Sequence, residues 1–178
     1  MFPMEQKCSL WTVFSVFCDE PSRIHYIKEI ARKVKLAPTS VKLHLKSLGK
    51  QGLIIKAKGD IFTGYKANND NKNFIFDKSI YNLMNIKESG LIDYLIEEFG
   101  PKTIVLYGSY LIGEDREGSD IDMFIATKTK KRIFPEKYEK ALNRRIHILT
   151  EPSIKRLPIE LRGEIINGLV LHGYLKNE

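Results

Sequence analysis

Apolar residues in the first fifty positions recur every three or four residues, which is the spacing of amphipathic helices. The pattern predicts three helices. The first has inward positions Leu10, Val13, Phe14 and Phe17. The second has inward positions Ile24, Ile27, Ile30 and Ala31. The third has inward positions Val41, Leu45 and Leu48.

Capping residues and glycines mark where these elements begin and end. Ser22 is expected to cap the second helix, and Thr39 or Ser40 the third, after a short turn over residues 34–38. Two strand-forming runs follow, at 53–58 and 61–67, joined by Gly59-Asp60. A glycine beside an aspartate between two such runs predicts a tight β-hairpin.

The second half of the chain alternates helix and strand patterns. A polar stretch at 68–73 reads as a linker, and helical spacing over 74–99 is broken at Ser89-Gly90 and ends at Gly100-Pro101. The first of these two helices either bridges two domains or pairs with its mate in a second copy, which would give a homodimer. Strands are predicted at 103–107, 120–126 and 145–149, and helices at 134–142 and 154–170.

The distribution of charge along the chain changes at the predicted linker. The 178 residues carry a formal net charge of +7, of which the first 70 hold +6. Between Pro21 and Lys58 there are 10 basic residues and one acidic residue, Glu29. We therefore expect two domains, 1–70 and 71–178, and the first either contacts nucleic acid or presents a solvated basic face. The basic loop 128–132 is either a solvated turn or a contact for triphosphate or nucleic acid.

The remaining composition is that of a cytoplasmic globular protein. No apolar run approaches the ~20 residues needed to cross a bilayer, so no membrane contact is expected. Cys8 and Cys18 lie in an apolar helical stretch, which favours buried free thiols in a reducing compartment over a disulfide.

The candidate chemistry lies between Gly108 and Asp122. Gly108-Ser109 ends a buried strand and begins a short helix, where backbone N–H groups suit a phosphate chain. Asp120 and Asp122 stand two apart on the next strand, so both carboxylates point to the same face. Their mutual repulsion is relieved by a divalent cation such as Mg²⁺, which also binds substrate phosphates.

These residues resemble the minimal nucleotidyltransferases of the DNA polymerase β superfamily. In that family the Gly-Ser turn binds a nucleoside triphosphate and the Asp-x-Asp pair binds Mg²⁺. The resemblance assigns nucleotide binding to Gly108 and Ser109, and catalysis and metal binding to Asp120 and Asp122. Ser119 matches the serine commonly found just before the first aspartate, and is assigned to the nucleotide as well.

One position departs from the family pattern. Active members usually add a third carboxylate from a later strand, and here that position holds His147, on the face opposite Ile146 and Ile148. A histidine brings no negative charge, which favours nucleotide binding over transfer. Glu151 is a candidate replacement for the missing carboxylate.

The N-terminal pattern of three helices and a hairpin resembles a winged helix-turn-helix. In that class the helix after the turn enters the major groove of double-stranded DNA and the hairpin forms a wing. The resemblance places DNA contacts on exposed positions of the third helix and the wing. These are Thr39, Ser40, Lys42, Leu43, Lys46, Lys50, Lys56 and Lys58.

The expected fold is α+β: a winged helix followed by a small α/β nucleotidyltransferase-like domain with a mixed sheet. One hypothesis is a prokaryotic DNA-binding enzyme that transfers a nucleotide to a hydroxyl acceptor. The alternative is a regulator, or an antitoxin-like protein paired with a helical HEPN partner, whose second domain binds nucleotide or a partner without turnover.

Overall fold

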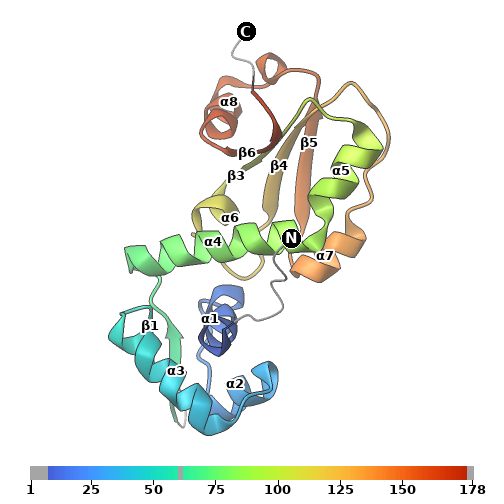
Figure 1. Cartoon of the computed structure of the whole chain (residues 1–178). Coiled ribbons are helices and arrows are strands. Elements are labelled where there is room, and N and C mark those ends of the chain that lie inside the picture. Colours follow the sequence, from blue (N-terminus) through green and yellow to red (C-terminus); the bar gives the residue numbers. More distant parts are fainter. Residues whose placement is uncertain (1–7, 60–61, 176–178) are drawn as a thin grey trace. The chain divides into compact units, whose positions relative to one another are not determined.

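The computed structural model describes residues 8–59 and 62–175 (Figure 1). Its internal contacts divide the chain into two compact units, residues 1–78 and 79–178. The predicted boundary followed Asp70, and the contacts divide the chain a little later, inside a helix. In the described ranges, no helix is both long and apolar enough to cross a membrane.

Three helices and a two-stranded sheet form the first unit. The helices are α1 (Ser9–Asp19), α2 (Ile27–Val34) and α3 (Pro38–Lys50). Strands β1 (Ile54–Lys58) and β2 (Thr63–Ala67) pair antiparallel. The predicted inward residues of α3, Val41, Leu45 and Leu48, are buried as expected. Cys18 is buried and Cys8 exposed, and both are free thiols, so the prediction of a buried thiol is wrong for Cys8.

The predicted helix caps in this unit are wrong. Helix α2 begins after Tyr26 rather than at Ser22, because His25 is held extended by two backbone hydrogen bonds to Tyr65. Helix α3 begins with Pro38 at its first position, so neither Thr39 nor Ser40 caps it. Proline suits this first position because its φ is already helical and it has no N–H group to leave without a partner.

The hairpin is longer than predicted. Lys58 pairs with Thr63, so four residues, 59–62, connect the strands instead of the two in Gly59-Asp60. The Gly59 N–H donates to the carbonyl of Phe62. Residues 60 and 61 lie outside the described part of the chain.

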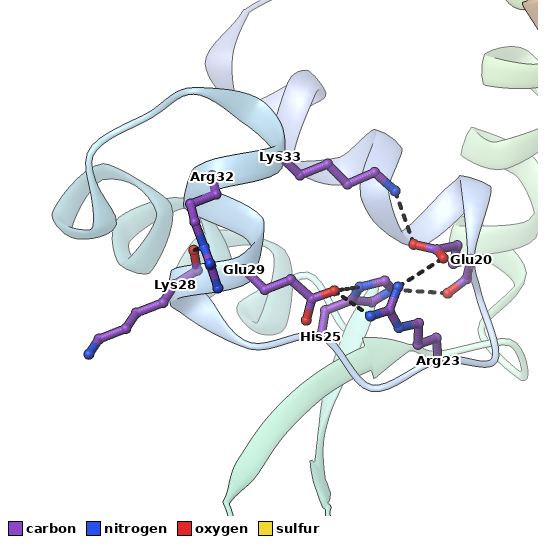
Figure 2. Close-up of polar contacts among 7 residues, drawn as sticks. All are labelled: Glu20, Arg23, His25, Lys28, Glu29, Arg32 and Lys33. Carbon is purple, nitrogen blue, oxygen red and sulfur yellow. Dashed lines mark hydrogen bonds and ion pairs between the residues drawn. The ribbon is translucent and has the colours of Figure 1, made fainter.

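Two acids in the first unit are neutralised by basic neighbours (Figure 2). Glu20 pairs with Arg23 and Lys33, each at 3.0 Å, and Glu29 pairs with Arg23 at 2.7 Å. Buried His25 donates from Nε2 to the Glu20 carbonyl at 3.1 Å. Arg23 and Lys33 are therefore engaged within the unit, which leaves the other cations of this region to face solvent.

The Glu20 ion pairs predict a pH-dependent stability. Burial raises the pKa of Glu20, but hydrogen bonds from Lys33 and Arg23 outweigh it and lower the pKa below its ordinary 4.5. The stability that the Glu20 ion pairs contribute is complete above about pH 4.5, and it is lost as the pH falls through the lowered pKa of Glu20. Glu20→Gln should lower stability at pH 7 by at most about 1 kcal/mol, since the pairs are partly exposed.

Thermal melting of the full chain between pH 7 and pH 2.5 measures this difference. The Glu20→Gln and wild-type curves should converge at the acid end. Asp70→Asn, at an exposed acid of the same unit, is the control and should follow wild type throughout. A constant gap between Glu20→Gln and wild type would rule out the ion pairs as its cause.

Part of the predicted linker is helical. The Asn71 side chain accepts hydrogen bonds from the N–H groups of Asn73 and Phe74, which caps α4 (Lys72–Ser89). As predicted, Gly90 interrupts the helical run, with φ +76°, and α5 (Leu91–Phe99) ends before Gly100-Pro101. The polar stretch therefore shortens to a turn.

A four-stranded mixed sheet organises the second unit, in the order β5-β4-β3-β6. Its strands are β3 (Thr103–Tyr107), β4 (Ile121–Ala126), β5 (Ile146–Glu151) and β6 (Leu169–Gly173). β3 pairs antiparallel with β4 and β6, whereas β4 and β5 are parallel. Short helices α6 (Ser109–Ile112) and α7 (Glu136–Leu142) lie in the connections. The predicted mixed sheet is confirmed.

The predicted final helix, 154–170, is correct only over its middle part. That segment forms a 3-10 turn (Ile154–Arg156), helix α8 (Ile159–Ile166) and the first two residues of strand β6. Pro158 separates the turn from α8, because proline cannot donate within a helix. At Gly168 a Cβ would lie 2.6 Å from the Leu106 carbonyl oxygen, so only glycine lets the chain approach β3 there.

The two faces of the sheet have separate cores (Figure 1). Ile121, Met123 and Ile125 pack with residues of α4 and α5 on one face. Phe124 and Ala126 pack with Ile154 and Ile165 on the other. Side chains alternate along β4, so Asp122 belongs to the second face.

Candidate functional site

The Gly-Ser turn leaves β3 in a conformation that glycine alone adopts readily. Gly108 has φ +77° and ψ −168°. Helix α6 follows directly, and the Ser109 carbonyl accepts hydrogen bonds from the N–H groups of Gly113 and Glu114. Among the described residues the Ser109 hydroxyl makes no side-chain hydrogen bond, so it is available to a ligand.

Asp122 lies directly against this turn. Tyr107 and Asp122 are partners in the β3–β4 ladder. A Cβ built on Gly108 would lie 2.8 Å from the Asp122 Oδ2. Glycine is therefore favoured by its backbone angles, and a larger residue here would also have to displace the Asp122 carboxylate. The fold brings the phosphate-type turn and one predicted metal-binding carboxylate into contact.

His147 faces the same carboxylate, as the alternation of β5 predicts. It is the β5 partner of Asp122, and its Nδ1 lies 3.2 Å from the Asp122 Oδ1. The His147 side chain is 64% exposed and that of Asp122 is 30% exposed, so solvent or a ligand reaches both. When protonated, the imidazole forms an ion pair with the carboxylate that a cation would otherwise use.

Glu151 does not replace the missing carboxylate. It pairs with Ala126 at the far end of the ladder, whereas His147 pairs with Asp122. Four residues of strand separate the two positions, about 13 Å. The alternative considered for Glu151 is therefore wrong.

Asp120 stands just before β4 and is exposed. It borders a hollow of about 560 Å³ that is also lined by Gly118, Glu139, Asn143, Arg144 and Arg145. In the described ranges, no three His, Cys, Asp or Glu side chains are grouped to hold a metal ion. The pair that the sequence assigns to the metal, Asp120 and Asp122, would suit Mg²⁺ only where substrate phosphates and water complete its coordination.

Ser119 has a role inside its loop. Its hydroxyl accepts a hydrogen bond from the Arg116 N–H at 2.9 Å, and its own N–H donates to the Arg116 carbonyl. These bonds close the turn that precedes Asp120. A contact of Ser119 with nucleotide remains a prediction.

A buried polar network anchors the loop that joins the Gly108-Ser109 turn to Asp120 and Asp122. The sequence analysis did not predict this network. Asn82 of α4 donates to the Tyr110 carbonyl at 2.8 Å and to the Asp115 Oδ1 at 2.7 Å. The other oxygen of Asp115 lies 3.6 Å from Arg144, and the two side chains are 1% and 6% exposed. The three residues come from distant parts of the chain, so no local spacing relates them.

Two carboxylates act on the phenol of Tyr107, the ladder partner of Asp122. Burial raises the pKa of the Tyr107 phenol, and the carboxylates of Asp122 and Glu164 raise it further. Tyr107 therefore stays protonated at neutral pH. Glu164, on α8, is a carboxylate close to this face that the sequence analysis did not single out.

Most cations of the first unit have no acidic partner. Among the described residues, eight exposed basic side chains between Pro21 and Lys58 form no ion pair. They are Lys28, Arg32, Lys35, Lys42, Lys46, Lys50, Lys56 and Lys58. Of the other predicted DNA-contact residues, Thr39 and Leu43 are exposed and Ser40 is half-buried. The predicted surface is thus accessible and strongly positive.

Comparison with known families bears on the second unit. Residues 88–172 match the family model of the nucleotidyltransferase domain. The nucleotidyltransferase-like segment runs from the end of α4 to β6 and contains the turn, both aspartates and His147. No curated protein matches the sequence significantly.

Proposed function

We propose that the chain binds a nucleoside triphosphate with Mg²⁺ in its nucleotidyltransferase-like unit and transfers the nucleotide to a hydroxyl acceptor. The observation that carries the proposal is the contact of Asp122 with the Gly108 turn. A phosphate-binding turn beside a metal-binding carboxylate suits a ligand that carries both phosphate groups and a bound cation.

Each residue has a part in this proposal. The N–H groups at Gly108 and Ser109 bind phosphate oxygens, and the Ser109 hydroxyl adds a donor. Asp120 and Asp122 hold Mg²⁺, which neutralises charge on the phosphates. The acceptor oxygen bonds to the α-phosphorus, the bond to the leaving diphosphate breaks, and the hydroxyl proton passes to solvent.

Incubation of the pure protein with labelled nucleoside triphosphates, Mg²⁺ and hydroxyl acceptors tests transfer. Asp122→Ala should lower the rate by a hundredfold or more, on the order of an essential electrostatic group. Glu114→Ala removes an exposed acid of the neighbouring loop and should leave the rate unchanged. An equal rate in wild type and Asp122→Ala would reject the enzymatic proposal.

The first unit supports a second part of the proposal. We infer that it is a winged helix that binds double-stranded DNA through α3 and the β1–β2 hairpin. Its three helices, its hairpin and the eight exposed cations that form no ion pair among the described residues favour this role. The base-reading side chains are few, so phosphate contacts should dominate affinity.

Salt dependence of duplex binding tests the DNA proposal. Replacing Lys42 and Lys46 with alanine should reduce the slope of log K against log salt by about 0.9 for each lost phosphate contact. A matched control replaces Lys72 and Lys87, which are exposed on α4. Equal slopes in the two double variants would contradict a DNA surface on α3.

A non-catalytic role is the second candidate. It is favoured by His147, which stands where active relatives place a carboxylate and contacts Asp122. The nucleotidyltransferase-like unit would then sense nucleotide or dock a protein partner, such as a helical HEPN protein. Mg²⁺-dependent nucleotide binding without transfer to any acceptor would favour this candidate over the enzyme.

A further inference from the structure

A basic and aromatic cleft lies in the second unit, outside the site described above. It has a volume of about 580 Å³ and opens between α5, α7 and the loop that joins β4 to α7. Three aromatic, three basic and one acidic side chain line it. They are Tyr94, Phe134, Tyr138, Lys131, Arg132, Lys137 and Glu98.

Direct contacts fix the aromatic residues of the cleft relative to one another. Tyr94 and Tyr138 stack with centroids 5.1 Å apart and planes inclined by 29°. The Phe134 N–H donates to the Tyr94 hydroxyl at 3.2 Å, which attaches the loop to α5. The Phe134 ring is nevertheless 55% exposed. A flat apolar surface is therefore presented to solvent.

Cations lie over these rings. The Arg132 guanidinium is 5.4 Å from the Phe134 centroid, and the Lys137 ammonium is 5.6 Å from that of Tyr138. Among the described residues neither cation pairs with an acid. Lys131 differs, because it binds the Glu98 carboxylate at 3.6 Å and the Glu98 carbonyl at 3.2 Å, and so holds the loop in place.

The charge of the segment extends beyond the cleft. Residues 128–140 contain six basic and two acidic side chains. A purely apolar partner would have to desolvate these cations, whereas a polyanion would be attracted to them. The ligand should therefore combine flat rings with regularly spaced negative charge.

We infer that this cleft binds single-stranded nucleic acid. Bases stack on exposed aromatic faces while backbone phosphates meet lysine and arginine, a combination that tolerates any sequence. A duplex cannot use the rings, because its base faces are covered by neighbouring pairs. The inference goes beyond the proposed function, which assigns double-stranded DNA to the first unit and a nucleotide to the Gly108 turn.

The cleft is separate from the proposed nucleotide site. Tyr94 and Tyr138 pack against the core of Ile121, Met123 and Ile125, and Asp122 points to the other face of β4. Loss of Asp122 should therefore leave strand binding intact. Failure of the nucleotidyltransferase proposal and failure of this one are thus distinguishable.

Fluorescence anisotropy with labelled ten-nucleotide probes, one thymidine DNA and one uridine RNA, tests the inference on the full chain. A background variant with Lys42 and Lys46 replaced by alanine suppresses binding to the first unit. Phe134→Ala should weaken binding of either probe about five- to a hundredfold, the usual effect of one lost stacking ring. Phe134→Tyr should restore it, and Asp122→Ala should not change it.

Phe76→Ala is the matched control, since Phe76 is an exposed ring of the first unit. It should bind both probes as the background does. Binding of one probe or of both supports the inference. A difference in affinity between the DNA and the RNA probe shows which sugar the cleft prefers. Equal affinity of both probes for Phe134→Ala and for the background would overturn it.

Discussion

Asp115→Ala is expected to destabilise the second unit by about 3–5 kcal/mol, the usual cost of removing one partner from a buried ion pair. The substitution leaves the nearly buried Arg144 guanidinium without its carboxylate and removes an acceptor of Asn82. Because Asp115 holds the loop between Gly113 and Ser119, weaker nucleotide binding should accompany the loss of stability.

Urea unfolding monitored by circular dichroism measures this change. Glu114→Ala, at the exposed neighbouring acid, is the matched control and should change stability by less than about 0.5 kcal/mol. If Asp115→Ala were no more destabilising than Glu114→Ala, the network would not anchor the loop.

His147→Asp is expected to strengthen Mg²⁺ binding at the proposed nucleotide site by about tenfold or more. The change removes a side chain that lies 3.2 Å from Asp122 and adds a carboxylate beside it. One additional negative charge about 4 Å from a divalent ion contributes about 2 kcal/mol even at the dielectric constant of water.

The Mg²⁺ concentration that half-saturates nucleotide binding measures this effect. His147→Asn removes the imidazole without adding charge, so it separates relief of the Asp122 contact from the new carboxylate. The midpoint should fall strongly only for His147→Asp. Equal midpoints for His147→Asp and wild type would mean that a metal does not bind between β4 and β5.

The local parts of the site could be read from sequence. The buried strand, the Gly108-Ser109 turn and the short helix after it each depend on residues close together in the chain. The structure contains all three elements. The alternation of Ile146, His147 and Ile148 likewise fixed which face His147 occupies. Period-two alternation and glycine conformation are local properties, so one sequence is enough to predict them.

The remaining parts depend on distant contacts. The sequence analysis did not predict β6, because this strand forms only by pairing with the free edge of β3. The start of α2 is set by Tyr65, about forty residues later, rather than by Ser22. Asn82, Asp115 and Arg144 meet only after the second unit has folded.

Calorimetric titration of the full chain with a non-hydrolysable nucleoside triphosphate, with and without Mg²⁺, tests the central claim most directly. Wild type should bind at least about tenfold more tightly with Mg²⁺. Asp122→Asn should lose that gain, and Gly108→Ala should bind weakly in both conditions because its Cβ meets Asp122. Mg²⁺-independent affinity, equal in wild type and both variants, would contradict a shared site at the turn and the aspartates.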